Sequence, residues 1–209
     1  MSRISGHKYI KTNCCGEQYR YLHFSSISFQ QDVYWTDGGG LRNSSLSSYS
    51  VKICKCGEVF KISEQIRLPI EICDVKNENT PINASLEDMV KFLVKNDEIE
   101  SDLIELVRRT VWRLQNDEFR NVYLDKSFRP TVQFKTNEES IRNMKKLIEI
   151  LSKSEFVNHF EIAELYRELG DFDKAKIEAL KIGDDDETLR KVQLDLIEKK
   201  IKEPTIYTP

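Results

Sequence analysis

Four cysteines in the first third of the chain form two short clusters, CCG at residues 14–16 and CKCG at residues 54–57. Thiolates are soft ligands, and four of them carried on two tight turns can complete a tetrahedral zinc site. In each cluster a glycine follows the second cysteine, which lets the backbone turn its amides toward the sulfurs. The clusters therefore predict one structural zinc ion, with these ligands: Cys14, Cys15, Cys54 and Cys56.

The spacing of these cysteines departs from the usual Cys-x-x-Cys pattern of a zinc knuckle. Thr12 and Ile53 stand where the first cysteine of each knuckle would be. Adjacent cysteines chelate one ion with strain, so Cys15 and Cys56 are the firmer ligands, and His7 or His23 could replace one of the others.

Three other interpretations of the clusters stay open at this level. The turns could persist without metal, or Cys54 and Cys56 could form a strained disulfide in a redox role. A catalytic zinc is disfavoured, because it needs an open coordination position and a general base, and no His-Glu-x-x-His motif occurs. The fifth cysteine, Cys73, is predicted to be a small core residue.

The two Cys-Gly turns are each followed by an aromatic, β-branched stretch, and this arrangement resembles the zinc-ribbon family over roughly residues 7–75. The resemblance implies that each turn feeds a β-hairpin and that zinc holds the two hairpins together. A module of this size buries a small core, and structural zinc can contribute on the order of 10 kcal/mol to its folding.

The stretches that must position the cysteines have the pattern of β-strands. Residues 19–35 are rich in aromatic and β-branched residues and partly alternate, and residues 51–61 alternate again. Residues 36–40, TDGGG, can make a tight reversal, and residues 41–50 are a polar stretch typical of an exposed loop. We therefore predict a zinc-ribbon-like β domain at residues 1–80.

Beyond a turn-rich linker at residues 76–85, the apolar period changes to about 3.6 residues, which is typical of helices. Ser85 with Asp88 predicts a capped helix start, and five or six helices are expected in residues 81–209. The composition changes at the same point, since six of the eight glycines and all five cysteines lie in the first 73 residues. The predicted class is α+β, a small β-rich domain followed by an all-helical bundle.

A helix hairpin is predicted around Gly170. The small, aromatic and glycine residues there are spaced as in the tetratricopeptide repeat, and the stretch resembles one unit of that family: Ala163, Tyr166, Gly170, Phe172 and Ala175. A single unit cannot bury its apolar face, so the resemblance implies packing on neighbouring helices or on a partner. An ordinary antiparallel helix hairpin within a bundle remains the alternative.

Aromatic and arginine side chains are dense between residues 111 and 130, and such groups can anchor a protein partner or stack on single-stranded nucleic acid. The alternative is an aromatic core with the arginines paired to local acids. The candidate partner-binding residues, including two from the helix hairpin, are Trp112, Arg113, Phe119, Arg120, Tyr166 and Phe172.

The sequence favours an adaptor over an enzyme. It contains no phosphate-binding loop, nucleophile elbow or kinase signature. Residues 1–80 carry ten Lys and Arg against eight Asp and Glu, and the remainder is acidic, so nucleic-acid binding is a weaker alternative. With no apolar leader or span, we expect a cytoplasmic, zinc-stabilised, non-enzymatic protein that binds another protein; a redox-responsive zinc protein is the further alternative.

Overall fold

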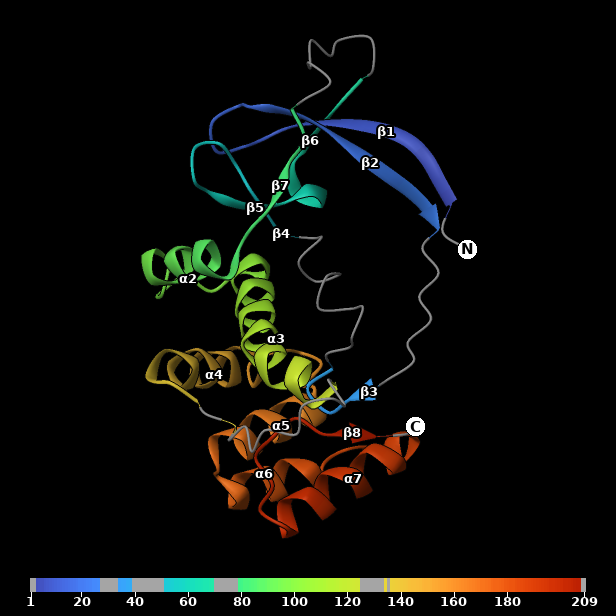
Figure 1. Ribbon diagram of the computed structural model, residues 1–209, viewed down its shortest axis with the longest axis vertical. Coiled ribbons are helices and arrows are strands. Elements are labelled where there is room, and N and C mark those ends of the chain that lie inside the picture. The colour runs from blue at the N-terminus through green and yellow to red at the C-terminus, as the bar shows by residue number, and fades with distance from the viewer. Residues whose placement is uncertain are drawn as a thin grey trace. The chain divides into compact units, whose positions relative to one another are not determined.

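The computed structural model describes residues 3–26, 34–38, 51–69, 79–124, 134 and 136–207. The chain divides into two compact units. Unit 1 comprises Met1–Gln30 and Ser45–Ile99, and unit 2 comprises Gln31–Ser44 and Glu100–Pro209. Small antiparallel sheets occupy the described N-terminal half and six α-helices follow, which confirms the predicted α+β class (Figure 1).

Unit 1 has two three-stranded antiparallel sheets in its described part. In the first, β1 (Arg3–Lys11) lies between β2 (Gln18–Ser26) and β6 (Ile66–Leu68). In the second, β4 (Val51–Ile53) lies between β5 (Val59–Lys61) and β7 (Ile82–Asn83). β1 has no counterpart among the predicted strands, because charged and glycine residues interrupt its apolar pattern. β7 lies within the stretch expected to be a linker.

The core of unit 1 is small and surrounds one of the cysteines. Ile10, Tyr19, Cys54 and Phe60 are buried together, and the rings of Tyr19 and Phe60 stack with centroids 6.0 Å apart. Within the described part of unit 1, Tyr21 and Ile62 are partly buried against this cluster.

The helix of unit 1, α2 (Leu86–Lys95), begins at Ser85 as predicted. Ser85 and Asp88 form a reciprocal capping box, which satisfies two otherwise unpaired donors at the helix start. The helix buries Met89 and Leu93, and Lys95 in its last turn forms an ion pair with Glu58 beside the second cysteine cluster.

Unit 2 is built from five helices and one short strand pair among its described residues. The helices are α3 (Asp102–Leu124), α4 (Glu138–Leu151), α5 (His159–Leu169), α6 (Phe172–Ala179) and α7 (Glu187–Glu198). β3 (Tyr34–Trp35) pairs antiparallel with β8 (Ile206–Tyr207) near the end of the chain (Figure 1).

The predicted helix hairpin is present as α5 and α6. Gly170 ends α5 in the left-handed conformation, with φ of +80°, and the Asp171 side chain then caps α6. Ala163 of α5 and Ala175 of α6 are fully buried, so their small side chains allow the two helices to pack closely.

α5 lies between two apolar clusters. Its residues Ile162 and Leu165 pack with Trp112 of α3 and with α4, whereas Ala163 packs with α6 and α7. α5 is therefore enclosed on several sides, and its polar residues are buried as well. None of the helices in the described ranges is long and apolar enough to cross a membrane.

Candidate metal centre and buried polar network

The first cysteine pair lies on the turn that joins β1 to β2. The amide of Thr12 donates to the carbonyl of Glu17 (2.8 Å), and the amide of Gly16 donates to the carbonyl of Thr12 (2.9 Å). Gly16 has φ of +76°, a conformation that L side chains rarely adopt, which explains the glycine after Cys15.

The second pair lies on a similar turn between β4 and β5. The amide of Cys54 donates to the carbonyl of Glu58 (2.9 Å), and Gly57, with φ of +87°, donates to the carbonyl of Cys54 (2.8 Å). Thr12 in the first turn thus occupies the place that Cys54 occupies in the second. The first turn is one residue longer, and its two sulfurs come from adjacent residues.

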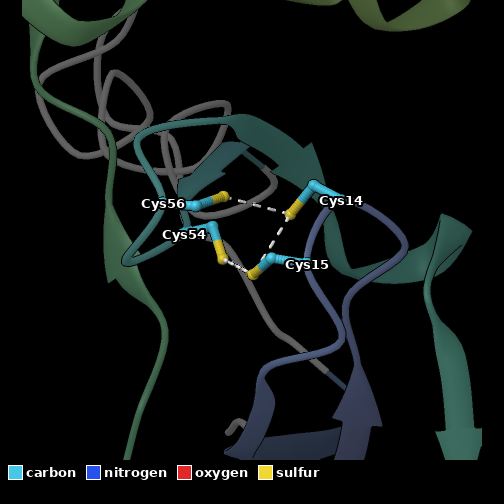
Figure 2. Close-up of side chains that lie close together, drawn as sticks. All are labelled: Cys14, Cys15, Cys54 and Cys56. Atoms are coloured by element: carbon cyan, nitrogen blue, oxygen red, sulfur yellow. Dashed lines mark hydrogen bonds between the residues drawn. The ribbon is translucent and has the colours of Figure 1, made fainter.

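The four sulfurs converge on one point between the two turns (Figure 2). The Sγ–Sγ distances are 3.4 Å for Cys15–Cys54, 3.5 Å for Cys14–Cys56 and 3.9 Å for Cys14–Cys15, and all four sulfurs lie within 4.8 Å of one another. Cys54 is buried, and the other three are exposed. In a tetrahedral site with zinc–sulfur bonds of about 2.3 Å, the sulfurs would lie about 3.8 Å apart. The cluster therefore fits a single tetrahedral ion.

Hydroxyl groups surround the two inner sulfurs. Thr12 Oγ1 lies 3.8 Å from the Sγ atoms of both Cys15 and Cys54. The Tyr19 hydroxyl accepts a hydrogen bond from the amide of Lys55 (2.9 Å) and donates to Cys54 Sγ (3.5 Å). Groups of this kind orient metal ligands and stabilise the thiolate form.

The pKa values of the thiols differ strongly across the cluster. Burial raises the pKa of Cys54, but hydrogen bonds from Tyr19, from the backbone amide of Cys56 and from neighbouring thiols outweigh burial and lower it to about 6. Loss of hydration raises the pKa of Cys14 to about 12, against the lowering effect of Thr12. A bound metal ion would deprotonate its thiol ligands, so these shifts describe the cluster without a cation.

His7, one of the two histidines considered as replacement ligands, does not belong to this cluster. His7 is exposed, and its Nε2 lies 3.1 Å from Arg20 Nη2. The backbone of His23 belongs to β2, and its side chain lies outside the described residues, as does the whole of Cys73. The only group of three or more potential metal ligands found in the described part of the chain is the four cysteines.

The six predicted partner-binding residues all belong to unit 2. Trp112 and Arg120 are almost completely buried. Arg113, Phe119, Tyr166 and Phe172 are partly exposed. The partly exposed aromatic rings contact other rings or the apolar cluster of α5, α6 and α7.

A network of buried charges lies among the helices of unit 2. Glu164 of α5 accepts hydrogen bonds from Thr36 (2.6 Å), from Gln193 (2.6 Å) and from Nε of Arg167 (3.0 Å), and all four side chains are buried. Arg167 also donates to the carbonyls of Ile201 and Glu203, which ties the C-terminal segment to α5.

A second part of this network surrounds Asp37. Its carboxylate forms a buried ion pair with Arg120 and accepts a hydrogen bond from Asn116 Nδ2 (2.8 Å). The same amide group donates to Glu168 (3.1 Å), whose other oxygen accepts from the Trp112 indole (2.8 Å). Burial, together with the nearby carboxylates of Glu164 and Asp37, raises the pKa of Glu168 well above its ordinary value.

No protein-family model, no curated protein and no solved structure matches this chain. The zinc-ribbon and tetratricopeptide resemblances therefore rest on the residues and turns described above.

Proposed function

We propose that Cys14, Cys15, Cys54 and Cys56 bind one zinc ion as thiolates and that this ion stabilises unit 1. The observation that carries the proposal is the convergence of four sulfurs, within 4.8 Å of one another, from two separate turns. An all-sulfur tetrahedral set is typical of zinc or of an iron–sulfur centre, and zinc is the ion usual for two Cys-Gly turns.

The role that we propose for the ion is structural. All four tetrahedral positions would be filled by protein sulfurs, which leaves no position for a substrate or for water. The sulfurs also join the β1–β2 turn to the β4–β5 turn, where the unit has only a small apolar core. A zinc ion there would add to the stability that this apolar core provides.

Elemental analysis of the purified full chain tests the metal. We expect about one zinc per chain, lost when Cys15 or Cys54 is changed to serine. Cys73→Ser is the matched control and should keep its zinc. A chain purified under reducing conditions without zinc, or one in which only Cys73→Ser loses it, would contradict the proposal.

We further propose that the protein is a non-enzymatic adaptor of a reducing compartment such as the cytosol, and that unit 2 contacts the partner protein. The buried Ala163–Ala175 contact and the left-handed Gly170 support a tetratricopeptide-like hairpin. Tyr166 and Phe172 of this hairpin are partly exposed, and aromatic side chains of this kind can anchor a partner.

Cross-linking of the tagged full chain in its native lysate, followed by mass spectrometry, tests the adaptor proposal. We expect cross-links from lysines of unit 2 to the same partner in independent preparations. A monomer with no reproducible cross-link would count against an adaptor, whatever its zinc content.

A further inference from the structure

The residues Tyr34–Gly38, here called the 34–38 segment, occupy an unusual place in the chain. The described residues on either side, Ser26 and Val51, belong to unit 1, whereas Gln31–Ser44 belongs to unit 2. The chain thus leaves unit 1, contributes a short stretch to the helical unit and returns. Within unit 2 the segment resembles a bound peptide.

The backbone of the segment is held as an added strand. β3 pairs antiparallel with β8, with Trp35 opposite Ile206. The amide of Thr36 donates to the carbonyl of Thr205 (3.0 Å), and the amide of Thr205 donates to Thr36 Oγ1 (3.1 Å). Strand addition of this kind is a common way for proteins to bind extended peptides.

The side chains of the segment are recognised individually. Thr36 donates to Glu164 Oε1 (2.6 Å) and lies 3.3 Å from Arg167 Nη2. Asp37 pairs with Arg120 and accepts from Asn116, while the Asp37 carbonyl accepts from Arg113 Nε (3.1 Å). These contacts suit a hydroxyl group followed by a carboxylate.

The aromatic residue of the segment lies beside a pocket in the described part of unit 2. Trp35 is 1% exposed, and it lines a pocket of about 270 Å³ together with Phe119, Pro204 and Ile206. Among the described residues this pocket adjoins the segment, and a larger or longer ligand could extend into it.

The groups named above that bind the segment come from Glu100–Pro209, so an identical segment of another protein would find these same donors and acceptors. We propose that this site is a receptor for an extended peptide with an aromatic, a hydroxyl and an acidic residue in succession. Trp35, Thr36 and Asp37 fill the receptor until a partner's segment replaces them. The inference rests on the adaptor function and names the chemistry of the partner.

Replacement from outside must compete with a tethered segment. A tethered segment can have an effective concentration on the order of mM, so a free peptide should bind the wild-type chain poorly. Weakening the internal segment should open the site. Asp37→Ala does so, because it removes the carboxylate that Arg120 and Asn116 hold.

The test uses the full chain with its metal and a fluorescent peptide of residues 31–44. By fluorescence polarisation we expect the Asp37→Ala chain to bind this peptide at least tenfold more tightly than the wild-type chain does. The same peptide carrying Asp37→Ala should bind the variant chain at least tenfold more weakly. Asp173→Ala, at an exposed aspartate of α6, is the matched control and should bind as the wild-type chain does.

Every outcome of this test decides the inference. If Asp37→Ala unfolds unit 2, the peptide should restore its unfolding transition, and failure to do so overturns the inference. A folded variant that does not bind the peptide also overturns it. If the wild-type chain is a dimer and the peptide dissociates it, the occupant of the site is a second copy of this chain rather than another protein, which contradicts the proposal. The peptide probes only this site. If it does not bind but a partner is cross-linked elsewhere on unit 2, the inference is wrong and the adaptor function is still supported.

Discussion

Each unit contains a cluster of ionisable side chains, and the charges of the two clusters are balanced in different ways. In unit 1 four ligands of the same kind converge, and all of them become negative when they ionise. In unit 2 the buried carboxylates of Glu164 and Asp37 lie against the guanidinium groups of Arg167 and Arg120. The zinc ion that we propose would supply the cation of the first cluster, whereas in the second cluster the cationic groups belong to the chain itself. The comparison implies that removal of metal should separate the stabilities of the two units.

Metal removal should have the largest effect and should act on unit 1 alone. A structural zinc ion contributes on the order of 10 kcal/mol to folding, more than a small core replaces. We expect a strong chelator to expose the amides of β1, β2, β4 and β5 to hydrogen exchange. Both tryptophans, Trp35 and Trp112, belong to unit 2, so their fluorescence should stay unchanged. If the chelator increased hydrogen exchange in unit 1 and also changed the tryptophan fluorescence of unit 2, the two units would not differ in their dependence on metal.

Arg167→Met should destabilise unit 2 and leave the metal in place. The substitution leaves the buried carboxylate of Glu164 without its cationic partner, and breaking such a pair costs about 3–5 kcal/mol of stability. Denaturation followed by tryptophan fluorescence measures the loss. Lys181→Met, which removes an exposed partner of Glu178, is the control. A loss below about 1 kcal/mol, or a parallel loss of zinc, would show that the network is not the organising centre of unit 2.

Tyr19→Phe should weaken the metal site without abolishing it. The change removes the hydroxyl that donates to Cys54 and accepts from the Lys55 amide, and groups of this kind are worth about 10–100-fold in metal affinity. Competition with a chromophoric zinc chelator measures the change. Tyr9→Phe, in the neighbouring strand β1, is the control, and equal losses in both variants would exclude a specific role for Tyr19.

Glu168→Gln should change the pH dependence of unit 2 rather than its fold. The pKa of Glu168 is higher in the folded state than in the unfolded state. The folded state therefore keeps a proton on this carboxyl group that the unfolded state releases above pH 4.5. This stabilisation is complete below that pH and is lost as the pH rises toward the folded pKa, by about 1.4 kcal/mol per pH unit.

The glutamine variant mimics the neutral acid, so its advantage over the wild-type chain should grow with pH by that amount. Unfolding measured at several pH values tests this, with Glu198→Gln on the exposed face of α7 as the control. Parallel curves for the wild-type and Glu168→Gln chains would mean that Glu168 is charged in the folded state.

Local features of the sequence were predictable because each depends on a few neighbouring residues. The Cys-Gly turns, the Ser85 capping box and the break at Gly170 all follow from backbone geometry that specific residue types require. The four cysteines were predicted as one cluster, and their sulfurs do lie together.

Features that depend on long-range contacts were missed. Nothing near Tyr34–Gly38 in the sequence indicates that it pairs with residues 205–207. Glu164 and Arg167 have the composition of a solvated helix face, and yet both are buried. The sequence feature that indicates this burial is the apolar residues on the other sides of α5. A helix that is apolar nearly all round is enclosed by other elements. Its polar residues must then pair with one another.

X-ray absorption at the zinc edge of the purified, reduced full chain tests the central claim most directly. The account predicts four sulfur ligands at about 2.3 Å and a spectrum that changes in Cys54→Ser but not in Cys73→Ser. Nitrogen or oxygen ligands in the wild-type chain, or a zinc-free chain whose melting temperature is unaffected by a strong chelator, would contradict it.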